Sequence, residues 1–271
     1  MRTGIGVVMN VIVVFFAIVT IIPFAWMLVS SFATNSEIVK IGGGLFPTMS
    51  TLQNYTDVQQ KFNFMRMFAN SLYISFIVTA IVVYTSSLAG FLFAKFTFRG
   101  KGLLFAVILS TMMLPWAVTL IPKYEMMMQF GWLDSYKSLI IPSMASAFGV
   151  FLFRQSISQI PDDLLEAARM DGANDFFIFH KIIVPTSKNT ISSLVIFQFL
   201  WAWEDFIWPF LMIDSPNKQL ISVGLKLFNG RYGTDYGGLF AATTITMIPV
   251  IVVYVVFQKQ FISGITAGSV K

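Results

Sequence analysis

The sequence predicts an all-α integral membrane protein with six transmembrane helices. Of its 271 residues, 56% are hydrophobic and only 11% are charged, less than half of the share of about 25% in soluble domains. A soluble globular protein could not cover its surface with so few charges. Disordered chains are poor in aromatic residues, whereas 16% of these residues are aromatic. The composition therefore excludes a water-soluble enzyme and a disordered chain.

Six apolar segments are candidates for membrane spans, because a hydrocarbon core of about 30 Å needs roughly 20 mostly apolar residues per helix. The first follows Arg2 as the apolar part of a signal peptide would. It is too long for one and lacks a clear cleavage site, so we expect it to be retained. We expect the whole chain, 1–271, to form a single transmembrane domain. Its predicted spans cover residues 7–32, 68–94, 103–121, 139–153, 191–213 and 238–257.

Lysine and arginine residues predict the orientation. Lys95, Arg99 and Lys101 lie in a very short loop between the second and third spans, where the positive-inside rule is most reliable. We therefore expect this loop, both termini, the polar segment 154–189 and the tail 258–271 to face the cytoplasm, with the protein in the cytoplasmic (inner) membrane.

The residue types that are missing limit the chemistry. The chain has no cysteine and one histidine, His180, which excludes a thiolate nucleophile, a cysteine metal site and a histidine cluster. No run of lysine and arginine of the kind that binds nucleic acid occurs. No G-x-x-x-x-G-K-[ST] phosphate loop occurs either. If transport is driven by ATP, the nucleotide must bind to another polypeptide.

The segment 154–189 predicts a short helix with a marked start and stop. Pro161 suits the first helical position, where no amide donor is required, and Asp162 suits the positive end of the helix dipole. Gly172 can take the left-handed conformation that ends a helix. Asn174 or Asp175 can then cap a second helix, which we expect over 176–184 and to be ended by the proline that follows. We call this helix–turn–helix of residues 161–185 the elbow.

The first elbow helix has one shallow face, formed at helical spacing by Leu164, Ala167, Ala168 and Asp171. Small alanine side chains allow another backbone to approach closely, and Glu166 and Arg169 project beside this face. Such an elbow suits a cleft in a cytosolic partner protein. An ordinary amphipathic hairpin that lies on lipid is the alternative.

The elbow resembles the EAA motif of binding-protein-dependent ABC importer permeases, which it matches as Glu166-Ala167-Ala168, three residues, Gly172, nine residues, Ile182, one residue and Val184-Pro185. Val184 stands where the family has leucine, a mild apolar exchange. The similarity to the carbohydrate, MalG-like branch of this family extends over nearly the whole chain. It includes Asn70-Ser71, Pro115, Ile121-Pro122, Phe151-Leu152-Phe153-Arg154-Gln155 and the tail from Gly264 to Lys271.

This resemblance implies the type I ABC importer permease fold and a subunit that carries an oligosaccharide or another sugar across the membrane. The subunit would be surrounded by membrane lipid and form a heterodimer with a second permease. It would also need two copies of an ATPase subunit, which bind the ATP and magnesium, and an extracytoplasmic solute-binding protein. It would have no catalytic residue, metal or cofactor of its own, and no nucleic acid partner.

The resemblance also implies roles for particular residues. The elbow would be the coupling helix that docks into the ATPase subunit, through Glu166, Ala167, Ala168, Arg169, Asp171, Gly172, Ile182 and Pro185. In the family the tail inserts between the ATPase subunits, which implies a second contact through Thr266, Ala267, Gly268 and Lys271. The outer loop of about 214–237 would reach the binding protein.

Two carboxylates, Glu204 and Asp205, lie inside the fifth predicted span beside Trp203. An intramembrane carboxylate is costly and normally faces a polar cavity or a partner, so these three residues are candidates for the translocation pathway. Tryptophan rings could stack on sugar faces while the carboxylates bind hydroxyl groups. The alternative places them in the aromatic belt at the outer membrane surface. Glu204 also departs from the asparagine that is common in the family.

Three other functions stay open. A permease of the same family could import a polyol, glycerol phosphate or polyuronide, although the spans offer almost no cations for an anionic substrate. A secondary transporter could use Glu204 or Asp205 as a proton carrier. An intramembrane enzyme has little support, because the scattered serine and aspartate residues show no recognisable catalytic pairing.

Overall fold

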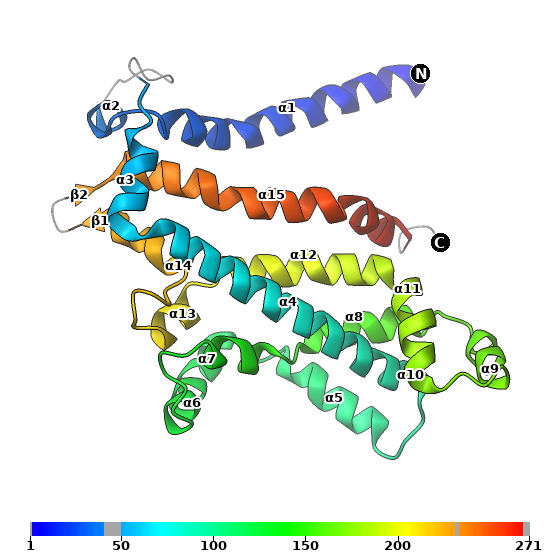
Figure 1. Ribbon diagram of the computed structural model, residues 1–271. Helices are drawn as coiled ribbons and strands as arrows, with labels where there is room; N and C mark the ends of the chain where they lie inside the picture. Colours follow the sequence, from blue (N-terminus) through cyan, green and yellow to red (C-terminus); the bar gives the residue numbers. More distant parts are fainter. Residues whose placement is uncertain (1, 41–49, 231–232, 268–271) are drawn as a thin grey trace. The chain divides into compact units, whose positions relative to one another are not determined.

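The computed structural model describes residues 2–40, 50–230 and 233–267, and Figure 1 shows the order of the elements along the chain. Most of the described chain is helical, as the composition predicts. The chain divides into two compact units. The first unit comprises residues 1–68 and 223–248, and the second comprises residues 69–222 and 249–271.

The first unit is built around two long apolar helices. Its elements are α1 (Arg2–Ser30), α2 (Asn35–Val39), α3 (Gln53–Phe62), the end of α14 (Ile221–Gly224), η3 (Leu225–Phe228), the short strands β1 (Asn229–Gly230) and β2 (Gly233–Thr234), which pair antiparallel, and the first part of α15 (Tyr236–Ala267). Every residue of α1 from Gly6 to Trp26 is exposed. A helix that is apolar on all sides and exposed is typical of a membrane span.

Polar side chains fasten the ends of these helices within the first unit. The amide of Asn54 donates to the backbone carbonyls of Ser31 and Ala33, both at 2.8 Å. The side-chain oxygen of Asn35 accepts from the backbone N–H of Tyr236 at 2.8 Å, at the start of α15. The first N–H groups of a helix have no partner inside it, so this contact satisfies a donor that would otherwise stay free.

The second unit carries the largest hydrophobic core and the elbow. Its elements are α4 (Phe64–Lys95) from residue 69 on, α5 (Lys101–Thr111), α6 (Trp116–Gln129), α7 (Lys137–Ile140), η1 (Ile141–Ser143), α8 (Ala147–Ile157), α9 (Asp162–Met170), α10 (Asp175–Ile178), the π-helix η2 (Phe179–Ile183), α11 (Val184–Thr186), α12 (Lys188–Glu204), α13 (Ile207–Met212) and the rest of α15. Val82, Phe153, Ile183 and Leu194 are completely buried in the core where α4, α8, η2 and α12 meet.

Helices α4 and α8 approach each other closely because glycine replaces a side chain at the contact. A Cβ atom on Gly90 would lie 2.9 Å from the backbone nitrogen of Arg154, closer than real Cβ atoms come. Gly149 on α8 is similarly covered by Ser86 of α4. Small residues at such contacts let transmembrane helices pack backbone against backbone.

Four helices in the described part of the chain are long and apolar enough to cross a membrane, and a bent pair raises the number to five at most. The bent pair covers the third predicted span, 103–121, which is therefore not one straight helix. Helix α5 ends at Thr111, α6 begins at Trp116, and the two are bent by 99°. Pro115 stands at the break, where it lacks an amide donor and restricts the residue before it.

The fifth predicted span, 191–213, is also divided. Helix α12 ends at Glu204, Asp205 is extended, and the short helix α13 begins at Ile207. The 17 residues of α12 give a length of about 26 Å, close to the lower limit for a membrane span. The interruption places Glu204 on the last residue of α12 and Asp205 on the non-helical backbone that follows it.

Candidate functional site

The elbow ends its first helix as the sequence predicts. Helix α9 begins at Asp162, so Pro161, with a ψ of 139°, precedes the helix and does not occupy its predicted first position. Gly172 follows the helix with a φ of 85°, in the left-handed region. The N–H of Gly172 donates to the carbonyl of Arg169 at 3.0 Å, and the N–H of Ala173 donates to that of Ala168 at 2.9 Å. These paired bonds form the Schellman motif, which satisfies carbonyls at the end of a helix.

The second half of the elbow is fixed by two polar contacts. The side-chain oxygen of Asn174 accepts from the N–H of Phe177 at 2.8 Å and so caps α10, which confirms one of the two predicted caps. The guanidinium of Arg169 donates to Oδ1 of Asp175, with Nη2 at 3.0 Å and Nε at 3.3 Å. Arg169 therefore links α9 to α10 within the chain.

The helix after the turn does not end before Pro185, and that prediction was wrong. The chain continues from α10 through the π-helix η2 into α11, which contains Pro185 as its second residue. A proline is tolerated in the first turn of a new helical segment because its missing N–H needs no partner there.

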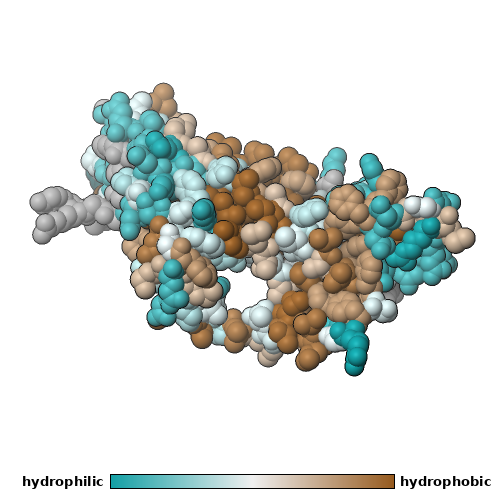
Figure 2. Space-filling model, turned by 60° about the horizontal axis from the view of Figure 1, so that its bottom comes forward, coloured by the Kyte–Doolittle hydropathy of each residue, from teal (hydrophilic) through white to brown (hydrophobic). Residues whose placement is uncertain are grey.

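The elbow presents an exposed apolar surface. Leu165 is 2% exposed and anchors α9 in the core, where Ala168 and Ile182 also pack. Glu166, Ala167, Asp171, Gly172 and Pro185 are exposed. The large apolar side chains that stay exposed are Leu164, Met170, Phe176 and Phe177, which we call the elbow surface. Figure 2 shows that the end of the molecule that carries α9 is mostly hydrophilic, unlike the brown helix surfaces beside it.

We expect Gly172→Val to destabilise the elbow, because a β-branched residue is forced into the left-handed region at a cost of about 1–2 kcal/mol. Gly172→Asn is the matched control, since asparagine tolerates this conformation. Limited proteolysis of the detergent-solubilised protein measures the effect, with faster cleavage near residue 172 expected only for the valine variant. Equal cleavage of both variants would show that the turn does not depend on glycine.

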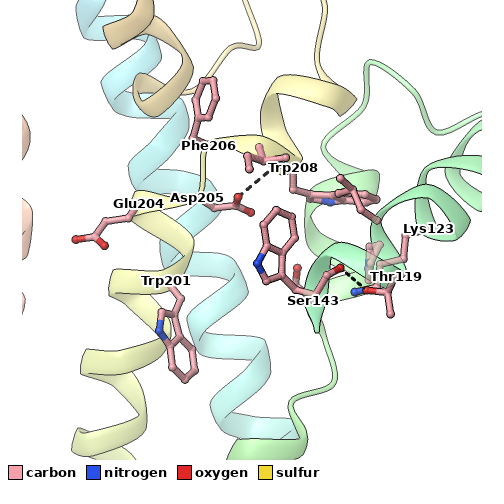
Figure 3. A pocket seen from close by; sticks show the side chains of 12 residues that line it. Thr119, Lys123, Ser143, Trp201, Glu204, Asp205, Phe206 and Trp208 are labelled. Atoms are coloured by element: carbon pink, nitrogen blue, oxygen red, sulfur yellow. Dashed lines mark hydrogen bonds between the residues drawn. The ribbon is translucent and has the colours of Figure 1, made fainter. Parts of the chain in front are cut away.

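A pocket of about 800 Å³ lies in the second unit where α12 ends. Figure 3 shows its walls, which come from α6, η1, the end of α12 and the start of α13. The pocket combines three indole rings with polar and charged groups, and it is lined by Trp116, Thr119, Leu120, Lys123, Pro142, Ser143, Trp201, Glu204, Asp205, Phe206, Ile207 and Trp208.

At the break in the fifth predicted span, the side chain of Asp205 accepts a hydrogen bond from a backbone N–H group that the helix does not use. Its Oδ1 accepts from the N–H of Trp208 at 3.3 Å, as the dashed line in Figure 3 shows. Its backbone carbonyl accepts from the hydroxyl of Ser222 at 2.7 Å. The indole of Trp208 in turn donates to the carbonyl of Ser138 at 2.9 Å. Asp205 therefore caps α13 and also contributes to the pocket wall.

The predicted pathway residues differ in where they lie. Glu204 and Asp205 line the pocket, and their carboxyl groups point in different directions (Figure 3). Trp203 is buried, stacks on Phe199 with ring centroids 5.8 Å apart, and does not line the pocket. Its neighbour Trp201 does so instead. Trp116, Lys123 and Trp208 also line it, and no sequence pattern singled them out, because their approach depends on tertiary packing.

Asp134, between α6 and α7, holds the loop that follows α13. Its carboxylate accepts from the hydroxyl and N–H of Ser215 at 2.5 and 3.0 Å and from the ammonium of Lys218 at 2.9 Å. The N–H of Asp134 donates to the carbonyl of Met212 at 2.7 Å. The hydrogen bonds from Ser215, followed by that from Lys218, hold the pKa of Asp134 far below its usual value.

A lowered pKa means that this contact stabilises the fold at pH values above the ordinary pKa of about 4 and is lost as the pH falls toward the pKa in the folded state. We expect the melting temperature of the wild type to fall more steeply below about pH 4 than that of Asp134→Asn, which has no proton to take up at this position. Melting curves between neutral pH and about pH 3 measure this difference. Parallel curves would contradict the role of Asp134.

Two of the four residues that were predicted to form the C-terminal contact lie in the described part of the chain. Thr266 and Ala267 are the last residues of α15. Gly268 and Lys271 lie outside the described residues.

A family model described as binding-protein-dependent transport system inner membrane component matches residues 86–266, well over half of the chain. The chain therefore belongs to this family of ABC transporter permeases. It is a membrane-embedded transport subunit of an ATP-driven importer, rather than an enzyme, and works with an ATPase and a solute-binding protein. Because the chain belongs to this family, a proton-coupled secondary transporter and an intramembrane enzyme are no longer open as functions.

Individual proteins are similar over most of their length. The arabinooligosaccharides transport system permease protein AraQ of Bacillus subtilis is 33% identical over 255 residues, which are 92% of this chain and 90% of that protein. The sn-glycerol-3-phosphate transport system permease protein UgpE of Shigella flexneri is 36% identical over 204 residues, 74% of this chain and 73% of that protein.

A solved structure has the same fold. The crystal structure of a bacterial ABC transporter involved in the import of the acidic polysaccharide alginate contains a chain that superposes with a TM-score of 0.85. The match covers 96% of this chain and 97% of that chain at 23% sequence identity. The fold is therefore that of a type I importer permease.

Proposed function

We propose that this chain is one of two permease subunits in an importer for an oligosaccharide or another sugar, delivered by an extracytoplasmic binding protein. The observation that carries this proposal is the connection of two sites. The capped elbow lies at one end of α12 and the pocket with indole and polar walls lies at the other. A sugar substrate is supported by the similarity to AraQ, whose name describes transport of arabinooligosaccharides.

The alternative within the family is a permease for a glycerol phosphate, polyol or polyuronide. The similarity to UgpE supports glycerol phosphate. The charged residues that line the pocket are two carboxylates, Glu204 and Asp205, and one ammonium, Lys123. Because like charges repel, this balance favours a neutral substrate over a phosphate or a uronate.

The experiment that tests the substrate is co-purification of the transporter with its binding protein, followed by mass spectrometry of the bound small molecule. The proposal expects a neutral mono- or oligosaccharide, together with ATP-dependent uptake of that saccharide. A bound phosphate ester or uronate would favour the alternative. Uptake of a saccharide that persists when the ATPase subunit is inactivated would contradict the function itself.

We further propose that both termini and the elbow face the cytoplasm, and that the ATPase subunit covers the elbow surface. The four apolar side chains of the elbow surface stay exposed among polar residues, and Met170 is 88% exposed. The carboxylate of Glu166 and the exposed Ala167 beside it provide a shallow, charged edge for docking, whereas Ala168 packs in the core. In the same proposal the tail, with Thr266, Ala267, Gly268 and Lys271, makes a second contact with the ATPase.

We expect Glu166→Lys to lower uptake at least about tenfold while the protein still folds, because a reversed charge at a docked interface costs several kcal/mol and Glu166 is exposed. Uptake per ATP hydrolysed in reconstituted vesicles measures the effect. Glu125→Lys, which reverses an exposed charge on α6, is the control. Normal coupling in Glu166→Lys would remove the docking role of this residue.

The predicted pathway residues Trp203, Glu204 and Asp205 lead to a second proposal, that sugar passes the pocket at the end of α12. Indole rings stack on sugar faces, and carboxylates accept hydrogen bonds from hydroxyl groups. The exposed indole rings that line the pocket are those of Trp116 and Trp201, and the exposed carboxylate is that of Glu204, whereas Trp203 is buried and does not line it.

We expect Trp201→Ala to raise the substrate concentration for half-maximal uptake by about threefold to tenfold, because a stacking contact contributes about 0.5–1.5 kcal/mol. Trp201→Phe retains an aromatic ring and is the matched control. Glu204→Gln tests the carboxylate in the same assay. If all three variants take up substrate as the wild type does, the pocket is not part of the pathway.

A further inference from the structure

Lys95 makes contacts that its place in a short basic loop does not explain. It is the last residue of α4, and its ammonium lies 2.7 Å from Oδ1 of Asp162, the first residue of α9. It also donates to the carbonyl of Ile160. The side chain of Lys95 is only 6% exposed, whereas that of Asp162 is 74% exposed.

Three effects favour this contact. A cation at the end of α4 and an anion at the start of α9 each complement the dipole of their own helix. A buried ammonium needs partners, and the carboxylate of Asp162 and the carbonyl of Ile160 supply them. The chain also joins α8 to α9 through residues 158–161, so the contact with Lys95 is a second connection of the elbow to the transmembrane helices.

The opposite end of α4 holds the loop that follows α13. The side-chain amide of Asn70 donates to the carbonyls of Asn217 and Gln219, both at 3.0 Å. The hydroxyl of Ser71 accepts from the N–H of Ile221 at 2.8 Å. The residues from Asn70 to Lys95 form one uninterrupted stretch of helix, about 38 Å long.

We propose that Lys95 is a positioning residue that fastens the elbow to α4, and that α4 passes movement of the elbow to the outer loop held by Asn70 and Ser71. This proposal rests on the proposed function, in which the elbow is moved by the ATPase. A helix is stiff along its axis, so a displacement at Lys95 reaches Asn70 with little loss. The outer loop then responds to the ATPase without any contact between the two.

The first test is Lys95→Met in the complete transporter reconstituted in vesicles. The methionine keeps an unbranched apolar side chain and removes both polar contacts of Lys95. We expect the ATPase subunit to remain bound, while uptake per ATP hydrolysed falls about tenfold, the scale of losing a hydrogen-bonded charge. Lys95→Arg keeps a long cationic side chain that can donate to both Asp162 and Ile160, and it is expected to retain most of the coupling.

Lys101→Met is the matched control, because Lys101 donates to the carbonyl of Phe96 at 2.7 Å and does not reach α9. Wild-type coupling in Lys95→Met, or coupling in Lys101→Met as poor as in Lys95→Met, would overturn the proposal. If Lys95→Met does not assemble, Asp162→Asn decides the question, because it weakens the ion pair and leaves the contact with Ile160 in place.

A double-mutant cycle tests the role of α4 as a connection, since interaction between distant sites is established by coupling energies and not by their positions. Asn70→Leu removes both hydrogen bonds at the outer end. If one helix carries the signal, the double variant of Lys95→Met and Asn70→Leu couples no worse than the poorer single variant. Losses that multiply would overturn the connection. Absence of ATP-dependent uptake by the wild type would instead refute the proposed function.

Discussion

The junction at Ser187, where the elbow meets α12, shapes the rest of this structure more than any other contact in the second unit. The N–H of Ser187 donates to the carbonyl of Ile183 at 3.0 Å, and the N–H of Ile191 donates to that of Ser187 at 2.9 Å. Ser187, with φ of −91° and ψ of 13°, is itself not helical, so these two bonds meet at one turn residue between α11 and α12. Since α12 ends at Glu204 in the pocket wall, the proposed function has a displacement of the elbow reach the pocket through this helix.

Broken helices are the second constraint. Backbone that is not helical is tolerated at membrane depth only where protein covers it or a polar cavity adjoins it. At the break near Asp205 the protein supplies its own partners, through the hydroxyl of Ser222 and the N–H of Trp208. The bend between α5 and α6 leaves Met113 and Leu114 exposed in this chain. Such an exposed bend fits the proposed cover by a second permease subunit.

The sequence was sufficient where structure is set by local chemistry. Apolar composition predicts the helical membrane fold, and the left-handed Gly172 and the cap at Asn174 follow from the properties of these residues alone. Features that join distant segments were not predictable. Asp134 meets Ser215 across 81 positions of the chain, and Lys95 meets Asp162 across 67. The pocket is lined by Trp201 and not by the predicted Trp203, and this too depends on packing between distant segments.

In the proposed function, a separate ATPase subunit binds the elbow and moves it, and one cross-linking experiment tests this contact directly. The chain contains no cysteine, so Ala167→Cys introduces a single thiol on the exposed side of α9. A photoreactive cross-linker attached to this thiol in the assembled transporter identifies the neighbour of the elbow. If the ATPase subunit covers the elbow, we expect a cross-linked product with that subunit whose yield changes when ATP is added. Cross-linking to lipid alone, or labelling of the thiol by a reagent confined to the outside of the cell, would contradict this contact.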